Sequence, residues 1–147
     1  MQKFRQRDEE FRWQNTERLA YKPDGTHFRD ITRQILLGPE HGLPIEVRYF
    51  EIGPDGHSTL ERHRHVHAVI VIRGSGQVLL GDRVESVDLL DTVYIAPLTW
   101  HQFRANRGEA LGFLCLVDCT RDRPERPGDE QVEELRHTPA VADFIRI

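Results

Sequence analysis

The segment HSTLERHRHVHAVIVIRG, residues 57–74, decides the prediction of the fold. In a β-strand, alternate side chains share one face of the sheet. One face would carry Glu61, His63, His65, His67, Val69 and Val71, and the other Arg62, Arg64, Val66, Ala68, Ile70 and Ile72. The first face is polar at one end and apolar at the other. This pattern is typical of the inner wall of a barrel with a binding site near its open end.

The three closely spaced histidines of this segment are candidate metal ligands, but strand geometry limits how they act together. Neighbouring side chains on one face of a strand are about 6.6 Å apart, so His63 and His67 would be about 13 Å apart. Metal–nitrogen bonds are only about 2.0–2.1 Å long. If more than two of these histidines bind, we expect the backbone to bend within residues 63–67 and another strand to add a ligand. The alternative is an exposed polar strand, or a tract that binds metal without a function.

The flanking sequence predicts further short strands. They are expected at FRDITRQILLG (28–38), IEVRYFEI (45–52), QVLL (77–80), RVESVDLL (83–90), DTVYIAP (91–97), HQFRAN (101–106) and LGFLCLVD (111–118). Turn residues separate them at intervals of about 8–12 residues, which indicates a β-sandwich or barrel. We therefore predict an all-β fold.

The two ends of the chain differ from this β pattern. The first 28 residues are polar and arginine-rich, and we expect an irregular arm with one short helix near residues 8–19. From residue 121 the chain is a proline-containing loop, followed by a short helix in the first half of DEQVEELRHTPAVADFIRI. The length of 147 residues favours one domain over residues 1–147, with a barrel core at about 30–120 and a tail at 121–147.

Composition excludes several classes of protein. No run of 18 apolar residues is present, and the charged N-terminus is unlike a secretory signal, so we expect a cytoplasmic protein that does not enter membranes. The net charge is −4, with basic and acidic residues interspersed, which argues against nucleic acid as a partner. Cys115 and Cys119 would lie about 13 Å apart in a flat strand, too far for a disulfide. We expect two buried, reduced thiols.

Two sequence motifs resemble those of the cupin family. PDGHSTLERHRHVHAVIVIRGSG, residues 54–76, resembles the first cupin motif, and PLTWHQFRAN, residues 97–106, resembles the second. DTVYIAP looks like the usual lead-in to the second motif, and the resemblance covers about residues 45–118. It implies a double-stranded β-helix, or jelly-roll, barrel. It also implies one divalent metal ion inside the barrel, which many cupins hold on three histidines and a glutamate.

The resemblance leaves one ligand open. The usual glutamate position, seven residues before Gly74, is occupied here by His67. The preceding pair is then either His63 with His65, or Glu61 with His63; both alignments keep His63, His67 and His101. We favour the metal ligands His63, His65, His67 and His101, with Glu61 as an alternative ligand or a supporting group. Imidazole ligands suit Fe, Mn, Ni, Zn or Cu, so the metal is not identified.

Two classes of function follow from the resemblance. The first is a metal-dependent enzyme, of the dioxygenase type or an isomerase, decarboxylase or lyase, acting on a small organic molecule in the barrel. The second is a non-catalytic cupin that binds or senses a metal or small ligand. Candidates for the cavity lining are Tyr49, Tyr94, Phe103 and Phe113. We also expect a homodimer, because cupins often dimerise and the outward apolar residues 66–72 need cover.

Overall fold

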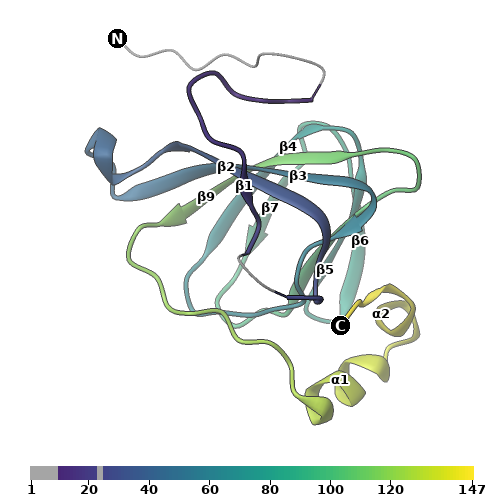
Figure 1. Cartoon of the computed structure of the whole chain (residues 1–147). Helices are drawn as coiled ribbons and strands as arrows, with labels where there is room; N and C mark the ends of the chain where they lie inside the picture. Colours follow the sequence, from purple (N-terminus) through teal and green to yellow (C-terminus); the bar gives the residue numbers. More distant parts are fainter. Residues whose placement is uncertain (1–9, 23–24) are drawn as a thin grey trace.

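The computed structural model describes residues 10–22 and 25–147, and it shows an antiparallel sheet curled into a barrel (Figure 1). The strands are β1 (Leu19–Ala20), β2 (Arg29–Leu37), β3 (Ile45–His57), β4 (His67–Arg73), β5 (Gly76–Leu80), β6 (Arg83–Val87), β7 (Thr92–Ile95), β8 (His101–Ala105) and β9 (Leu111–Asp118). The helices are the 3-10 turn Pro39–His41, α1 (Asp129–Arg136) and α2 (Pro139–Phe144). The expected all-β jelly-roll class is confirmed.

The strand order explains how distant parts of the sequence meet. Hydrogen-bonded neighbours follow the order β6-β5-β8-β3-β9-β4-β7, and β2 also pairs with β3. β3 is long enough to pair with β9 along residues 45–52 and then to reach β8 at His57. Strands that are far apart in sequence are therefore adjacent in space, as expected for a jelly roll.

The interior is apolar at one end and polar at the other. Residues Val69 and Val71 of β4, Phe103 and Ala105 of β8, and Leu111 and Phe113 of β9 belong to one buried cluster. β4 begins at His67 and β8 begins at His101, so each strand runs from a histidine into this cluster. Alternation along the strands then places the histidines at one end of the barrel interior.

The segment that was expected to form one strand, residues 57–74, contains a loop. β3 ends at His57 and β4 begins at His67. The backbone between them is irregular, apart from isolated β-bridges from Glu61 to His101 and from Arg62 to Glu125. The bend expected within residues 63–67 is confirmed, since residues 64–65 form a bend and the strand starts two residues later.

Apart from β1, the described part of the N-terminal arm is irregular, and the helix expected near residues 8–19 is wrong for residues 10–19. The backbone has positive φ at Phe11 and Asn15, of 54° and 61°, which a helix does not allow. The side chain of Gln34 on β2 accepts a hydrogen bond from Trp13 N and donates one to the Phe11 carbonyl. Since Gln34 satisfies these backbone groups, the arm lies against β2 without helical hydrogen bonds.

The C-terminal tail forms two short helices where one was expected. Pro139 begins α2, because proline lacks the N–H that a helix interior needs and suits a first helical position. Val132 of α1 and Val141 and Phe144 of α2 pack on Leu60 and Leu79 as a second buried cluster. The helices thus cover the outside of the barrel, near β5 and β6 in Figure 1. None of the described helices is long and apolar enough to span a membrane.

Candidate metal centre and cavity

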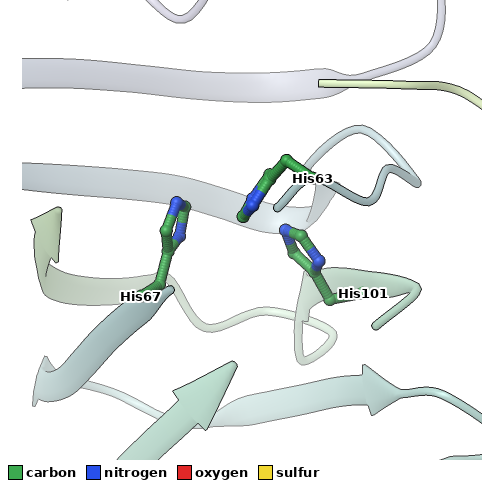
Figure 2. Close-up of side chains that lie close together, drawn as sticks. All are labelled: His63, His67 and His101. Atoms are coloured by element: carbon green, nitrogen blue, oxygen red, sulfur yellow. The ribbon is translucent and has the colours of Figure 1, made fainter. Parts of the chain in front are cut away.

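Three histidines converge at the polar end of the barrel. His63 comes from the loop before β4, His67 from the first position of β4, and His101 from the first position of β8. One ring nitrogen from each lies within 4.8 Å of the others. Figure 2 shows the three rings pointing toward one another around a common space. The loop brings the His63 and His67 ring centroids to 4.5 Å, although a regular strand would have kept them far apart.

Hydrogen bonds from these rings fix which nitrogen faces the common space. The Nδ1 atoms of His63 and His101 lie 2.8 and 2.9 Å from the carbonyl oxygens of His65 and Thr99. A carbonyl only accepts, so each Nδ1 carries the proton and each Nε2 has a free lone pair. Metal-binding histidines are usually oriented in this way.

Two buried ring nitrogen atoms without partners indicate whether a metal ion fits between these histidines. His63 Nε2 and His67 Nε2 are buried and have no hydrogen-bond partner among the described residues. A buried polar atom without a partner costs about 1–3 kcal/mol, so such atoms are usually explained by a function or a bound ion. Three convergent imidazoles with free lone pairs therefore fit a divalent metal ion.

Burial keeps these histidines neutral. Desolvation, helped by the neighbouring rings of His101 and His65, lowers the pKa of His63 to about 4. Desolvation also lowers the pKa of His67 far below its usual value and lowers that of His101. A metal ligand must be the unprotonated imidazole. At neutral pH the site is therefore in the protonation state that metal binding needs.

His65 lies beside this group and outside it. Its ring is stacked on that of His63, with centroids 3.6 Å apart, while its centroid is 5.1 Å from that of His67. Its Nδ1 donates to the Asp122 carboxylate at 2.6 Å. The structure thus brings together three of the four expected ligands, and a four-histidine ligand set stays a prediction.

Asp122, in the tail after β9, holds the histidine loop in place. Its carboxylate accepts hydrogen bonds from the backbone N–H groups of Arg64 and His65, at 2.8 and 3.0 Å, in addition to that from the His65 ring. These bonds, led by that from Arg64 N–H, hold the pKa of Asp122 well below its usual value. The tail therefore fixes the conformation that brings His63 next to His67.

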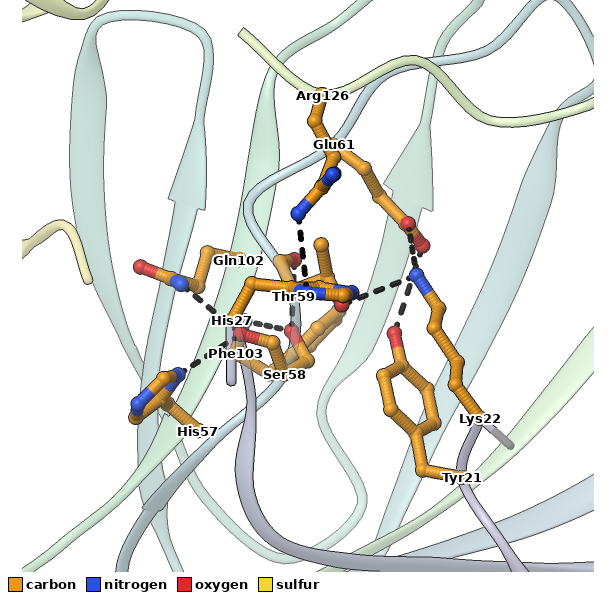
Figure 3. A network of polar contacts seen from close by, with 10 residues as sticks. All are labelled: Tyr21, Lys22, His27, His57, Ser58, Thr59, Glu61, Gln102, Phe103 and Arg126. Atoms are coloured by element: carbon orange, nitrogen blue, oxygen red, sulfur yellow. Dashed lines mark hydrogen bonds and ion pairs between the residues drawn. The ribbon is translucent and has the colours of Figure 1, made fainter. Parts of the chain in front are cut away.

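Glu61 faces the same cavity, and the N-terminal arm neutralises its carboxylate. Lys22 Nζ lies 2.6 Å from Glu61 Oε2, and the Tyr21 hydroxyl donates to Glu61 Oε1 at 3.4 Å (Figure 3). The Glu61 backbone pairs with that of His101. Glu61 is not among the three converging groups. It is a buried carboxylate close to the histidines, bound to a lysine and a tyrosine.

The histidines lie at the wall of a cavity of about 220 Å³. Its apolar lining includes Ile31, Phe50, Val69, Phe103 and Phe113, and its polar lining includes the four histidines 63, 65, 67 and 101 with Glu61. A small organic molecule would meet aromatic rings on one side and imidazoles on the other. Small-molecule sites commonly have this composition.

Two of the four aromatic residues expected to line the cavity are elsewhere. Phe103 and Phe113 do line it, but Tyr49 and Tyr94 do not. Tyr49 faces outward on β3, where it stacks on Phe11 of the arm, and Tyr94 on β7 is 64 % exposed. Alternation is the reason, because the residues flanking each tyrosine point inward.

The sequence predicts an ordinary buried thiol at Cys115, but this thiol lines the cavity. Its sulfur lies 3.4 Å from Arg48 Nη2 and 3.6 Å from His67 Nδ1. Burial raises the pKa of the Cys115 thiol, and Arg48 opposes this. Alternation from Phe113 along β9 was the signal that would have placed it inward. Both cysteines are free, as expected, but the expectation that both are buried is wrong for Cys119, which is partly exposed just after the end of β9.

Comparisons with known proteins agree with this architecture. No family model matches the chain. A cupin 2 conserved barrel domain protein from Rhodopseudomonas palustris is 46 % identical, with TM-score 0.92 over 99 % of this chain and 100 % of its own. A cupin-2 domain structure from Rhodospirillum rubrum is 47 % identical, with TM-score 0.88 over 96 % of this chain and 95 % of its own. This chain is a cupin.

One similar protein carries a functional name. It is "1-methylthio-D-xylulose 5-phosphate methylsulfurylase" from Rhodospirillum rubrum, and it is 47 % identical to this cupin over 143 residues. The match covers 97 % of this chain and 91 % of that protein. The polyketide cyclase RemF of Streptomyces resistomycificus, at 20 % identity and TM-score 0.73 over 90 % of this chain and 94 % of its own, shares the fold.

Proposed function

We propose that this cupin is a metal-dependent enzyme that acts on 1-methylthio-D-xylulose 5-phosphate, or a close analogue, and transfers its methylthio group. The observation that carries the proposal is the convergence of three neutral histidines, of which His63 and His101 are buried and His67 is partly buried, in a cavity of about 220 Å³. The substrate class comes from the name of the Rhodospirillum rubrum relative. We make the proposal for this chain because the two sequences are similar over nearly their whole lengths.

His63, His67 and His101 would hold one divalent ion of Fe, Mn, Ni, Zn or Cu, with His65 as the candidate for a fourth ligand. The ion would act as a Lewis acid on a carbonyl oxygen of the substrate. The hydrogen bonds of the His63 and His101 Nδ1 atoms to backbone carbonyls orient the rings for this task. Such a site suits a ketose, whose carbonyl carbon is next to the carbon that carries the methylthio group.

Glu61 is the candidate group for moving a proton. Transfer of the methylthio group to a thiol acceptor forms a sulfur–sulfur bond and breaks the bond between sulfur and the carbon beside the carbonyl. That carbon keeps the electron pair and takes up the proton that the thiol gives up. The Glu61 carboxylate is 8 % exposed, lines the cavity and is bound to Lys22 and Tyr21. Lys22 forms an ion pair with it at 2.6 Å, and we propose that Glu61 takes the proton of the acceptor thiol and delivers it to the carbon that loses the methylthio group.

Cys115 is a candidate contact for the substrate. Its thiol faces the cavity beside His67 and Arg48. We expect Cys115→Ala to lower turnover by about 100-fold while metal content stays the same, a loss typical of a removed side-chain function. Cys119, which does not line the cavity, supplies the matched control. If Cys115→Ala kept full turnover, the thiol would have no part in the reaction.

The test of the proposal combines metal analysis with turnover. Untagged protein should contain about one metal ion per chain, and it should consume 1-methylthio-D-xylulose 5-phosphate in the presence of a small-thiol acceptor, followed by phosphorus NMR and mass spectrometry. A chelator should abolish turnover, and readdition of metal should restore it. Metal-replete protein that left this compound unchanged would contradict the proposed substrate.

The oxygenase and sensor alternatives predict different results. An oxygenase would consume dioxygen in step with substrate, whereas the proposed transfer consumes none. A sensor would bind the sugar phosphate or the metal without turning anything over. Oxygen electrode traces recorded during the turnover experiment separate these cases from the proposal.

We also propose that the protein is a homodimer. Large apolar side chains are exposed at one end of the sheet, around β7 and the histidine loop: Val66, Leu89, Leu90, Tyr94 and Leu98. Exposed apolar patches commonly mark protein interfaces. Sedimentation velocity at micromolar concentration should give a dimer, and Tyr94→Glu should shift it to monomer. Only monomer for the unmodified chain would contradict this proposal.

A further inference from the structure

The cavity carries more positive charge than its carboxylates balance. Lys22, Arg33, Arg48 and Arg121 line it, and Glu61 is the one carboxylate among the lining residues that the structure describes. These cations come from four separate segments, so no local sequence pattern singles them out. Their acidic partners decide how much net charge the cavity keeps.

Two of the four cations are neutralised by acidic neighbours. Lys22 forms its ion pair with Glu61 at 2.6 Å. Arg121 forms one with Glu46 at 2.9 Å and also donates to the Asp118 carbonyl. These two side chains therefore contribute little net charge to the cavity.

Arg48 on β3 is almost fully buried at 8 % exposure, yet its charge is poorly matched. Its nearest carboxylate, Glu46, is 3.9 Å from Arg48 Nε and is shared with Arg121. Its Nη2 donates to the Cys115 sulfur, a weak acceptor, and Nε has no hydrogen-bond partner among the described residues. A buried guanidinium usually has a bidentate acidic partner.

Arg33 on β2 lies beside Arg48 on the inner face. The register pairs Arg33 with Phe50 and Ile35 with Arg48, so the two arginines are diagonal neighbours across the β2–β3 pair. Arg33 Nε is also buried without a partner, and no ion pair links Arg33 to an acidic group in residues 10–22 or 25–147. Two adjacent guanidinium groups therefore face the cavity with unused donors.

We propose that Arg33 and Arg48 form an anion subsite that binds the phosphomonoester end of the substrate while its carbonyl end meets the three histidines. This inference rests on the proposed function for the substrate class. A phosphomonoester carries a charge of about −1.5 to −2 at pH 7, which complements Arg33 and Arg48, whose only carboxylate contact is the long one to Glu46. Guanidinium groups donate to phosphate oxygens in pairs, in the fork geometry that a lysine lacks.

The test compares two ligands that differ only in the phosphate. D-xylulose 5-phosphate and D-xylulose are titrated into metal-loaded protein by calorimetry, without any turnover. The unmodified chain should prefer the phosphorylated sugar by about 10- to 100-fold, the range for hydrogen bonds to charged groups. Arg33→Met and Arg48→Met keep the apolar stem and should each lower this preference about 10-fold.

Controls separate the subsite from folding and from the metal. Arg107→Met, at an exposed turn between β8 and β9, should keep the full preference. Arg48→Lys should recover part of it, because the charge returns without the fork. Melting temperature and metal content are measured for every variant. If Arg48→Met does not fold, Arg33→Met tests the subsite, because Arg33 is only half-buried. The titrations are repeated after metal removal, because a metal ion also binds phosphate.

Several results would overturn the subsite: no preference for the phosphorylated sugar in the unmodified chain, an unchanged preference in folded Arg33→Met, or a preference that depends only on the metal. The proposed function fails separately. If the methylthio sugar phosphate is not consumed, yet the phosphate preference exists and is lost in the arginine variants, the subsite stands and the proposed reaction falls.

Discussion

The two ends of the barrel interior are made by the same strands but differ in how their buried side chains are satisfied. At the apolar end, Val71, Leu111 and Val78 are fully buried and pack on one another. At the polar end, His63, His101 and Arg48 are nearly as buried, but their polar atoms lack partners or point to a shared space. The apolar end stabilises the fold, and the polar end keeps unsatisfied groups that a ligand can satisfy. Substitutions at the apolar end should therefore lower the free energy of unfolding, whereas substitutions at the polar end should lower metal binding and turnover.

The largest expected effect is the loss of the metal in His101→Ala. Removal of one of three converging ligands should lower bound metal to well below one ion per chain. Turnover should fall by at least about 100-fold, because loss of a ligand has a larger effect than loss of a residue that only hydrogen-bonds to a ligand. Elemental analysis and the turnover assay measure this. Phe103→Leu, two residues along the same strand, should keep the metal. His137→Ala, on the exposed end of α1, is the histidine control.

At the apolar end, Leu111→Ala should lower the free energy of unfolding by about 2–5 kcal/mol, because the deleted side chain leaves a cavity in a fully buried position. Chemical denaturation of the protein without metal measures this. Leu90→Ala, where the side chain is 72 % exposed, should change stability by less than about 0.5 kcal/mol. Equal losses in the two variants would mean that burial does not distinguish these sites.

Asp122→Asn tests whether the tail organises the polar end. The substitution weakens the hydrogen bonds that hold Arg64, His65 and the His65 ring, so metal affinity should fall about 10- to 100-fold. Competition with a chromogenic chelator gives the affinity. Asp129→Asn, in the first turn of α1, is the control. Unchanged affinity in Asp122→Asn would show that the loop keeps its conformation without the tail.

The last expected effect is a pH dependence of stability that arises mainly at the polar end. The folded chain depresses the pKa of His63 to about 4, whereas the unfolded chain has the ordinary value of about 6.5. Below pH 6.5 the unfolded state binds more protons, so stability is full above this value and falls as pH approaches 4. From pH 7 to 5, the His63 shift alone should cost metal-free protein about 2 kcal/mol, or roughly 4–8 °C in melting temperature. The pKa values of His67 and His101 are also lowered, so His63→Leu should reduce this slope without abolishing it. An unchanged slope would show that His63 does not contribute.

Much of the fold was readable from the sequence because strand alternation is local. The pattern in residues 67–73 and 111–118 predicts strands, and both are observed as β4 and β9. Alternation also explains why Phe103 and Phe113 face the cavity. Alternation also accounts for the outward directions of Tyr49 and Tyr94, but it predicts them only once the inward face of each strand is known. The helix expected in the arm failed because Gln34, on a distant strand, satisfies the backbone of residues 11 and 13.

The sequence by itself determined the barrel class and the three histidines that converge in the structure, since periodicity and motif spacing are properties of the chain. It also required a bend within residues 63–67, because a straight strand cannot bring His63 to His67. The tertiary structure decided what lies around them. It placed Asp122 against the loop, Lys22 and Tyr21 on Glu61, and Arg33 beside Arg48 and Cys115. These partners come from residues many positions apart, and only the closing of the barrel sets their distances and burial.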